Sequence, residues 1–461
     1  MKDNSLQKES RADRFASDPR IIEAKKLILN TMEEYKQKIT VISPSDPKKE
    51  LRYKELIEEF NRMRGGNLWY PYIGSGMGNG ALVELLDGSI KYDFIGGIGV
   101  HYWGHNHPDI VDAALNAAIE NTVLQGHLQQ NFETVEFSEL LLQNSTMDCC
   151  FFSTSGAMAN ENALKIALQK NSPASRILAF ENCFAGRTLA LSQITDKPAY
   201  REGLPDTLYV DYLPFYDPEN PEKSTEKAIS VLKNHLARHP KKYGAFIGEL
   251  IRGEAGFYPG SHRFFSSLMS ILKKEGIAII ADEIQTFGRT DRLFAYQHFE
   301  LEEFVDIVTI GKLSQVCATL FRKDFQPKPG LLSQTFTGST ATLRCGKMII
   351  QSLLNDGYFG TKGKIQKLHE YFTAGLENLQ KKYPNAIKGP WGIGAMIAFT
   401  PFGGNKEKVL EFSRNLFRDG VISFIAGENP MRIRFLIPVG AVKEKDIDEV
   451  LKIIENLLKA E

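Results

Sequence analysis

Apolar runs of strand length alternate with helical patterns through the middle of this chain. Strands are predicted at residues 149–153, 177–181, 243–250 and 277–281, and helices at 159–169, 221–238 and 264–275. This alternation is typical of an α/β domain with a mainly parallel sheet. Ligands of such sheets bind at the carboxyl ends of the strands, so the residues that follow each strand are the first candidates for a functional site.

Charged side chains follow two of the apolar runs. The run 277–281 leads to Asp282, and a later run, 306–310, is followed by Lys312. An acid and a lysine at neighbouring strand ends can converge on one small molecule. An amine there favours Schiff-base chemistry with a carbonyl cofactor, although a lone lysine after a strand is more often a snorkelling or solvent-facing residue.

Composition narrows the classes of function. The 461 residues suit two or three domains, and 56 basic residues balance 56 acidic ones, which argues against a nucleic acid or an anionic membrane as the main partner. The five cysteines form no CxxC pair, so no metal site is expected. The polar N-terminus and the lack of an apolar run of about 18 residues predict a soluble, cytoplasmic protein.

The predicted organisation has three parts. Residues 1–66 form a charged helical segment, residues 67–343 form a large domain whose first part pairs with the small domain, and residues 344–461 form that smaller α+β domain. Further elements are expected as helices at 20–38 and 48–64, a hairpin with strands at 81–86 and 91–95, strands at 395–400 and 431–437, and a final helix at 443–459.

Two strand ends carry motifs suited to a phosphorylated, planar ligand. Ser155, Gly156 and Ala157 precede a helix whose free N–H groups and dipole suit a phosphate, although a tight turn without a ligand has the same pattern. After the next strand, Phe184 would lie against a heterocycle and Arg187 would bind a carboxylate. A core phenylalanine and a solvated arginine are the alternative interpretation.

The segment after the strand at 277–281 offers further contacts to a ring. Asp282 would keep a pyridine nitrogen protonated, and Gln285 would donate to a phenolate oxygen of the same ring. Ile284 lies between them and would pack on a ring face. The alternative is a strand-end acid that caps the next turn.

Two further clusters contain arginines or acids. Glu249, Arg252 and Glu254 lie at the end of a predicted strand, where they form either part of a site or a surface ion-pair cluster. Arg432 and Arg434 lie on one face of the strand 431–437. Arginine suits bidentate capture of a carboxylate, but an exposed edge strand has the same pattern.

Taken together and in this order, these segments resemble the class III pyridoxal-phosphate-dependent aminotransferases of fold type I. The resemblance runs from about Gly78 to the C-terminus. Segments 93–98 and 104–108 match the family's early region closely. The run 282–286 with Lys312 is the most specific match, because both its sequence and its spacing fit.

The resemblance implies a role for each ring-binding residue. Lys312 would hold pyridoxal 5'-phosphate as a Schiff base and then shuttle a proton. Asp282 would pair with the pyridine nitrogen, and Gln285 would reach the ring oxygen. Phe184 and Ile284 would stack on the two faces of the ring.

Phosphate binding and assembly are implied in the same way. Ser155, Gly156 and Ala157 resemble the family's phosphate cup. Thr335 matches the threonine that family members lend to the phosphate of the partner subunit. The resemblance therefore implies a homodimer with shared active sites.

Three residues are implied to bind substrate. Glu254 would mask Arg434 while an ω-amine is bound, and would swing away when a 2-oxo acid needs that arginine for its α-carboxylate. Arg187 matches a second carboxylate-binding arginine. Two such arginines suit 2-oxoglutarate as the amino acceptor.

Departures from the family pattern leave the donor open. Segment 313–318 replaces a usual glycine-rich run, and this variant resembles lysine 6-aminotransferases and partly the 4-aminobutyrate branch. Leu250 and Arg252 replace a usual proline and glutamine on the substrate side, and the charge of Arg252 disfavours a cationic donor. Met158 and Ala185 also depart from the family's residues.

We therefore predict a ping-pong aminotransferase of amino-acid metabolism that moves an amino group from an ω-amine or amino-acid donor to 2-oxoglutarate. A decarboxylase, racemase or aminomutase of the same fold would keep the cofactor and change the reaction. A catalytically degenerate scaffold protein is the non-enzyme alternative. The departures favour that alternative, whereas the intact Lys312, Asp282 and Gln285 argue against it.

Overall fold

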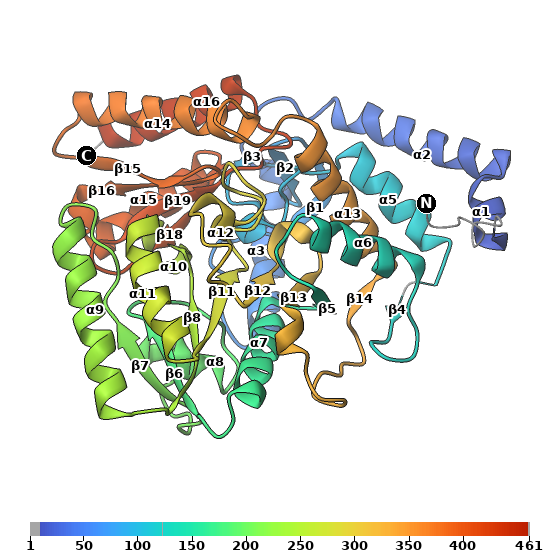
Figure 1. Ribbon diagram of the computed structural model, residues 1–461. Helices are drawn as coiled ribbons and strands as arrows, with labels where there is room; N and C mark the ends of the chain where they lie inside the picture. The colour runs from blue at the N-terminus through green and yellow to red at the C-terminus, as the bar shows by residue number, and fades with distance from the viewer. Residues whose placement is uncertain (1–9, 122, 460–461) are drawn as a thin grey trace.

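A seven-stranded sheet forms the centre of the computed structural model, which describes residues 10–121 and 123–459 (Figure 1). Its strands lie in the order β5 (Cys149–Ser153), β13 (Cys317–Phe321), β12 (Ile307–Ile310), β11 (Ala278–Glu283), β8 (Tyr243–Gly248), β6 (Arg176–Phe180) and β7 (Tyr209–Leu213). The strands from β12 to β7 pair in parallel, whereas β13 pairs antiparallel with β12 and β5. The predicted α/β fold with a mainly parallel sheet is confirmed.

The inner strands of this sheet are buried along their whole length. Every residue of β8, β11, β12 and β13 is buried, as is typical of sheets covered by helices. The packed helices are α7 (Gly156–Lys170), α9 (Pro221–Arg238) and α11 (His262–Lys274). Within these four strands, charged residues occur only at the carboxyl end of β11, which is where the sequence predicted a site.

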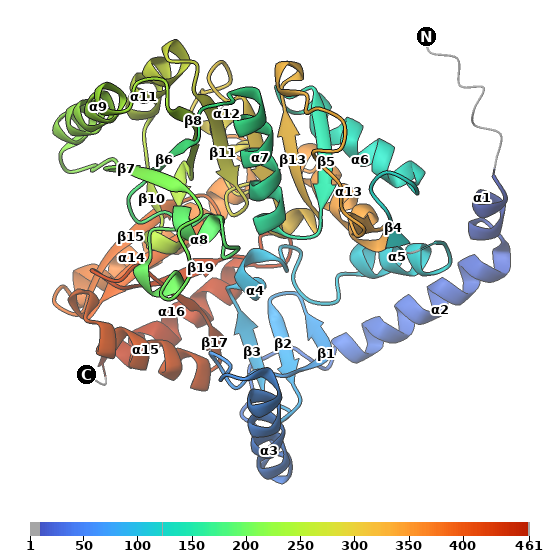
Figure 2. The same cartoon turned by 90° about the horizontal axis from the view of Figure 1, so that it is seen from below.

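The helices predicted at 20–38 and 48–64 are present, whereas residues 1–9 of the predicted charged N-terminal segment lie outside the described residues. Helix α2 (Pro19–Lys36) begins after the N-cap Asp18, whose carboxylate accepts a hydrogen bond from the N–H of Arg20, and α3 (Pro47–Arg64) ends at the left-handed Gly65. A short helix, α1 (Arg11–Ala16), was not predicted. Figure 2 shows α2 and α3 extending from the body of the molecule. In the described ranges, none of the helices combines the length and apolar character needed to cross a membrane.

An early part of the chain joins a late part in a second sheet. The predicted hairpin is present as β2 (Leu82–Leu85) and β3 (Ile90–Asp93), preceded by β1 (Gly74–Asn79). Strand β17 (Val421–Ile422) pairs in parallel with β3 and completes the order β1-β2-β3-β17. Residues before the central sheet therefore pack with residues near the C-terminus.

The C-terminal part contains a four-stranded antiparallel sheet, in the order β15 (Ile387–Ile393), β16 (Met396–Pro401), β19 (Arg432–Leu436) and β18 (Phe424–Ala426). Helices α14 (Lys364–Lys382), α15 (Lys406–Arg418) and α16 (Glu444–Lys459) accompany it. Strand β19 lies between two neighbours, and all of its residues are buried. The alternative of an exposed edge strand for its two arginines is therefore wrong.

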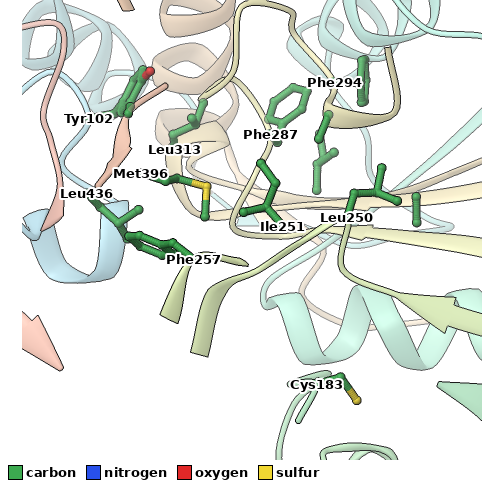
Figure 3. Close-up of a cluster of buried hydrophobic side chains, with 14 of the residues drawn as sticks. Tyr102, Cys183, Leu250, Ile251, Phe257, Phe287, Phe294, Leu313, Met396 and Leu436 are labelled. Carbon is green, nitrogen blue, oxygen red and sulfur yellow. The ribbon is translucent and has the colours of Figure 1, made fainter. Parts of the chain in front are cut away.

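One apolar core joins the C-terminal sheet to the loops of the central sheet (Figure 3). Ile251 comes from the short strand that follows β8, and Leu313 from the 3₁₀ turn that follows β12, while Met396 and Leu436 come from β16 and β19. All four side chains are buried, so dense packing fixes the loops that hold the site. The remaining elements are α4 (Gly96–Gly99), α5 (Pro108–Ala118), β4 (Val123–Leu124), α6 (Phe132–Gln143), α8 (Leu191–Ile194), β9 (Ile251–Arg252), α10 (Gly253–Gly256), β10 (Tyr258–Pro259), α12 (Ala295–His298), β14 (Gly338–Ser339) and α13 (Thr340–Asn355).

Candidate active site

A cavity of about 410 Å³ lies at the carboxyl edge of the central sheet. Asp282 at the end of β11 and Lys312 after β12 both line it, because parallel neighbours end at the same edge. The predicted convergence of this acid and this lysine on one site is therefore observed. The lining residues are Val100, Thr154, Gly156, Ala157, Asn160, Phe184, Ala185, Gly186, Arg187, Glu249, Glu254, Asp282, Ile284, Gln285, Lys312, Gln315 and Cys317.

The Asp282 carboxylate is buried and held by two hydrogen bonds. Oδ1 accepts from the N–H of Ile284 at 3.0 Å, and Oδ2 accepts from Nδ2 of Asn160 at 2.7 Å. Burial raises the pKa of Asp282 to about 6, although both hydrogen bonds act in the opposite direction. A cation placed against this carboxylate would therefore be bound strongly, since it would offset the cost of burying the charge.

Asn160 is a site residue that the sequence interpretation missed. It lies on the first turns of α7, and its Nδ2 also donates to the carbonyl of Ala185 at 2.8 Å. Its Oδ1 accepts from the hydroxyl of Thr309 on β12 at 2.7 Å. These bonds fix the amide so that it presents Nδ2 to Asp282. The sequence did contain an indication of this pair: Asn160 and Thr309 are polar residues at positions of a helix and a strand that face the core.

Lys312 adopts a backbone conformation that is uncommon for a residue with a side chain. Its φ is 57°, in the left-handed region, and it opens a single 3₁₀ turn, Lys312–Ser314, directly after β12. Burial lowers the pKa of Lys312, and the charge of Arg434 acts in the same direction, while Asp282 and Glu254 oppose the shift. A lowered pKa increases the fraction of neutral amine, which is the nucleophilic form.

The N-terminus of α7 borders the same cavity. Gly156 is required there, because a Cβ atom on it would lie 2.8 Å from Cγ2 of Ile284. Ser155 is the N-cap, and its hydroxyl accepts a hydrogen bond from the N–H of Met158 at 3.2 Å. Its side chain does not line the cavity, whereas Thr154 does. Among the predicted cup residues, the cavity therefore brings together Gly156 and Ala157 but not Ser155.

A second and larger cavity, of about 760 Å³, adjoins the first at Glu254, which lines both. Glu254 Oε1 lies 2.6 Å from Nη2 of Arg434, and Nη1 of Arg434 donates to Oε1 of Gln285 at 3.4 Å. Burial alone would raise the pKa of Glu254, but the Arg434 guanidinium lowers it. The two side chains that the resemblance pairs are thus in contact. Glu249 and Arg252 are also buried, so the alternative of a surface ion-pair cluster is wrong.

The other predicted substrate and phosphate residues differ in where they lie. Arg187 lines the first cavity, and its guanidinium lies 4.0 Å from the centroid of the Tyr200 ring. Thr335 lies in the exposed loop before β14 and does not line either cavity of its own chain. No cluster of three or more histidine, cysteine, aspartate or glutamate side chains suited to a metal occurs in the described ranges.

Comparison with known families decides the class of protein. Residues 72–458 match the family model for class III aminotransferases. The chain belongs to the class III aminotransferases. Two relatives of this class III aminotransferase are acetylornithine aminotransferases. The one from Caldanaerobacter subterraneus subsp. tengcongensis is 28% identical over 88% of this chain and 97% of the relative. The one from Methanocaldococcus jannaschii is 31% identical over 76% of this chain and 87% of the relative.

Solved structures share the fold of this class III aminotransferase. The lysine aminotransferase from M. tuberculosis superposes with a TM-score of 0.77 at 22% identity, covering 88% of this chain and 99% of that structure. An aminotransferase from Bacillus anthracis gives a TM-score of 0.79 at 17% identity, covering 89% of this chain and 99% of that structure. At these identities the likeness shows the fold alone.

Glu249 gives this class III aminotransferase a testable pH dependence. Its carboxylate accepts from the N–H groups of Gly253 and Phe184, yet burial raises its pKa to about 7, and the charge of Asp282 adds to the shift. A pKa that is higher in the folded state stabilises the fold at low pH, and this contribution is lost as the pH rises towards 7. Between pH 5.5 and 7, the free energy of unfolding of the cofactor-free wild-type protein is expected to fall by about 2 kcal/mol more than that of Glu249→Gln. Denaturant unfolding at the two pH values measures this difference. An unchanged pH slope in the variant would contradict this assignment.

Proposed function

We propose that this aminotransferase uses pyridoxal 5'-phosphate at the first cavity to move an amino group from an ω-amine or amino-acid donor to 2-oxoglutarate by a ping-pong mechanism. The observation that carries the proposal is the meeting of Lys312 and Asp282 in one cavity that also includes Phe184 and Ile284. Membership of the family establishes the class of reaction. The residue roles, the acceptor and the order of steps are what is proposed.

The residues present fit the cofactor of this family. Asp282 is a buried carboxylate suited to a protonated ring nitrogen, because its raised pKa marks a charge that a cation would stabilise. Gln285 receives the Arg434 hydrogen bond on Oε1, which leaves its Nε2 to donate to a ring oxygen. Gly156 and Ala157 offer N–H groups at the start of α7 for a phosphate. When bound, this cofactor supplies an electron sink for charge that develops on the substrate carbon.

Lys312 would carry the proton in each half-reaction. Its Nζ lies in the cavity with a lowered pKa, so the neutral amine would accept a proton from the donor carbon that bears the amino group. The same atom would return a proton when the 2-oxo acid is aminated. Asp282 would hold the ring and its nitrogen proton throughout, with Asn160 keeping the carboxylate in place.

Glu254 and Arg434 would select between the two substrates. In the described arrangement the glutamate covers the arginine, which suits an ω-amine that presents no α-carboxylate. A 2-oxo acid would take the arginine after Glu254 swings away, and Arg187 would bind its second carboxylate. The position of Glu254 between the two cavities supports this role, because movement of one side chain would change both.

A homodimer with shared active sites is part of the proposal. Thr335 is exposed and far enough from its own cavity that it is not among the lining residues, as a residue lent to a partner must be. Neighbouring Phe336 and Leu128 are large exposed apolar side chains, at 61% and 84% exposure. An apolar surface of this kind favours association with a second copy.

The Glu254→Ala variant tests the proposed selection. It is expected to slow the half-reaction with ω-amines by about 10-fold relative to the half-reaction with α-amino acids, because Arg434 would then be open to α-carboxylates at all times. Single-turnover absorbance changes with each donor class measure this ratio. Glu219→Ala, on the exposed surface, is the matched control and should leave the ratio unchanged. An equal loss with both donor classes would contradict the selecting role.

A screen of amine donors with 2-oxoglutarate, read as glutamate formed, tests the function itself. Glutamate production with at least one donor is expected. Consumption of donors without any glutamate would favour a decarboxylase, racemase or aminomutase. Purified protein that stays colourless after addition of the cofactor would favour a scaffold protein.

A further inference from the structure

Five side chains form a stack in which cations alternate with aromatic rings beside the second cavity. The guanidinium of Arg432 lies 4.4 Å from the Trp391 ring and 4.0 Å from the Tyr258 ring. The guanidinium of Arg252 lies 5.1 Å from the centroid of the same Tyr258 ring and 4.1 Å from that of Phe215. This cation–aromatic stack joins the C-terminal sheet to the central sheet and fixes Arg252 in one place.

Arg252 carries a buried charge with no acid paired to it. It is 8% exposed, Nη1 donates to the carbonyl of Glu181 at 2.9 Å, and Nε has no hydrogen-bond partner. Within the described ranges Arg252 forms no ion pair, and the carboxylate of nearby Glu249 is taken by backbone N–H groups. A buried, unpaired guanidinium is costly unless an anion binds it.

The second cavity offers the place for that anion. Arg252 lines the cavity together with Lys197, and Glu254 forms the boundary to the cavity of Lys312. The acid nearest to Lys197 is Glu428, 4.0 Å away and 76% exposed, so water screens that pair. Asp196 also lines the cavity, but its carboxylate lies 3.9 Å from Arg201. A ligand that extends from Lys312 past Glu254 would therefore meet the unpaired charge of Arg252 at its far end.

We propose that Arg252 is a specificity-determining residue that binds a carboxylate at the end of the amino donor opposite to the reacting amine. The inference rests on the proposed function and names the donor class: ω-amino acids whose far end is acidic, in preference to neutral amines and diamines. The guanidinium would bind the carboxylate with its free N–H groups while the stack holds its plane. A cationic far end would be repelled by the buried charge of Arg252.

Three donors of equal chain length test the proposal: 5-aminopentanoate, pentylamine and 1,5-diaminopentane. The wild-type protein is expected to prefer 5-aminopentanoate over the other two by about 100-fold in kcat/KM for the donor half-reaction. Arg252→Met keeps the length of the stem and removes the charge, so its preference should fall to within about threefold. Arg252→Lys should retain an intermediate preference. Equal use of the three donors by the wild-type protein would overturn the proposal.

A matched control separates the second cavity from a smaller one on the other side of Arg252. Lys223 lines that smaller cavity and is exposed. Lys223→Met should leave the donor preference unchanged. A loss equal to that of Arg252→Met would place the carboxylate in the smaller cavity and contradict the proposal.

A binding measurement keeps the inference independent of turnover. Calorimetry with pentanoate, which has the carboxylate and no amine, should show binding to the cofactor-loaded wild-type protein and at least about 10-fold weaker binding to Arg252→Met. Pentanol is the neutral control. Absence of pentanoate binding would overturn the role of Arg252. Binding of pentanoate by a protein that catalyses no transamination would contradict the proposed function alone. Circular dichroism and melting temperature of both variants report whether the stack still holds the fold.

Discussion

Replacing Lys312 with alanine is expected to abolish the visible absorbance of the cofactor-loaded protein at about 400–430 nm, the range of the protonated imine of this cofactor. Turnover should fall by at least about 10⁴-fold, because the variant loses both the covalent link and the group that moves the proton. Lys312 is the lysine that lines the first cavity, so no other lysine in that lining can replace it. Absorbance spectra and single-turnover rates measure the two effects.

A surface lysine provides the control for this variant. Lys274→Ala, at the exposed end of α11, should keep both the absorbance and the rate. Retention of the visible absorbance by Lys312→Ala would rule out the assignment of the covalent link. Absorbance lost with the rate intact would separate the link from the proton transfer and contradict the second role.

Replacing Asp282 with asparagine should lower turnover by about 10²–10³-fold, the usual effect of removing one group that stabilises charge in the transition state. The amide has the size of the carboxyl group but cannot hold a protonated ring nitrogen, so the ring would withdraw electrons less well. The fold should tolerate the change, because burial raises the pKa of the wild-type carboxyl group to about 6. Ionisation of that group at neutral pH therefore lowers the stability of the cofactor-free wild-type protein.

Two measurements and a control variant separate the chemical effect from a structural one. The melting temperature of the cofactor-free Asp282→Asn protein at pH 7.5 should stay close to that of the wild type, because relief of the buried charge offsets the loss of one of the two hydrogen bonds that the carboxylate accepts. Rates of single turnover should fall even when the cofactor is saturating. Asp109→Asn, an exposed residue at the start of α5, should change neither property. Wild-type rates in Asp282→Asn would remove the carboxylate from the proposed site.

The parts of the site that follow strands were predictable from the sequence. Strand ends of a parallel sheet share an edge, so placing Asp282 after one strand and Lys312 after the next was enough to predict that they converge. Phe184 and Ile284 follow by the same rule, since each comes after a strand of that sheet. Helices α2 and α3, which both begin at a proline, were predicted to within two residues at each end.

Contacts between distant segments were not predictable in this way. The bond between Asn160 and Asp282 joins residues 122 positions apart, and no periodicity carries that pairing. The position of β19 inside its sheet depends on its pairing with β18. That strand has three residues, which is too short for an alternating pattern to indicate it. The stack through Arg252 depends on the position of β19, because this strand supplies the buried Arg432. The short helix α1 was missed because no apolar periodicity distinguishes it from its charged surroundings.

The bonds made by Asn160 have a practical consequence. They tie α7, β11 and β12 together through protein groups alone, so they fix the Asp282 carboxylate, which is proposed to face the ring nitrogen, by contacts that involve no ligand. We therefore expect the Asp282 side of the pocket to be rigid. The cofactor-free protein should accept ring-modified analogues of vitamin B6 without refolding around each one. Reconstitution with a series of such analogues would measure how much each ring substituent contributes to binding.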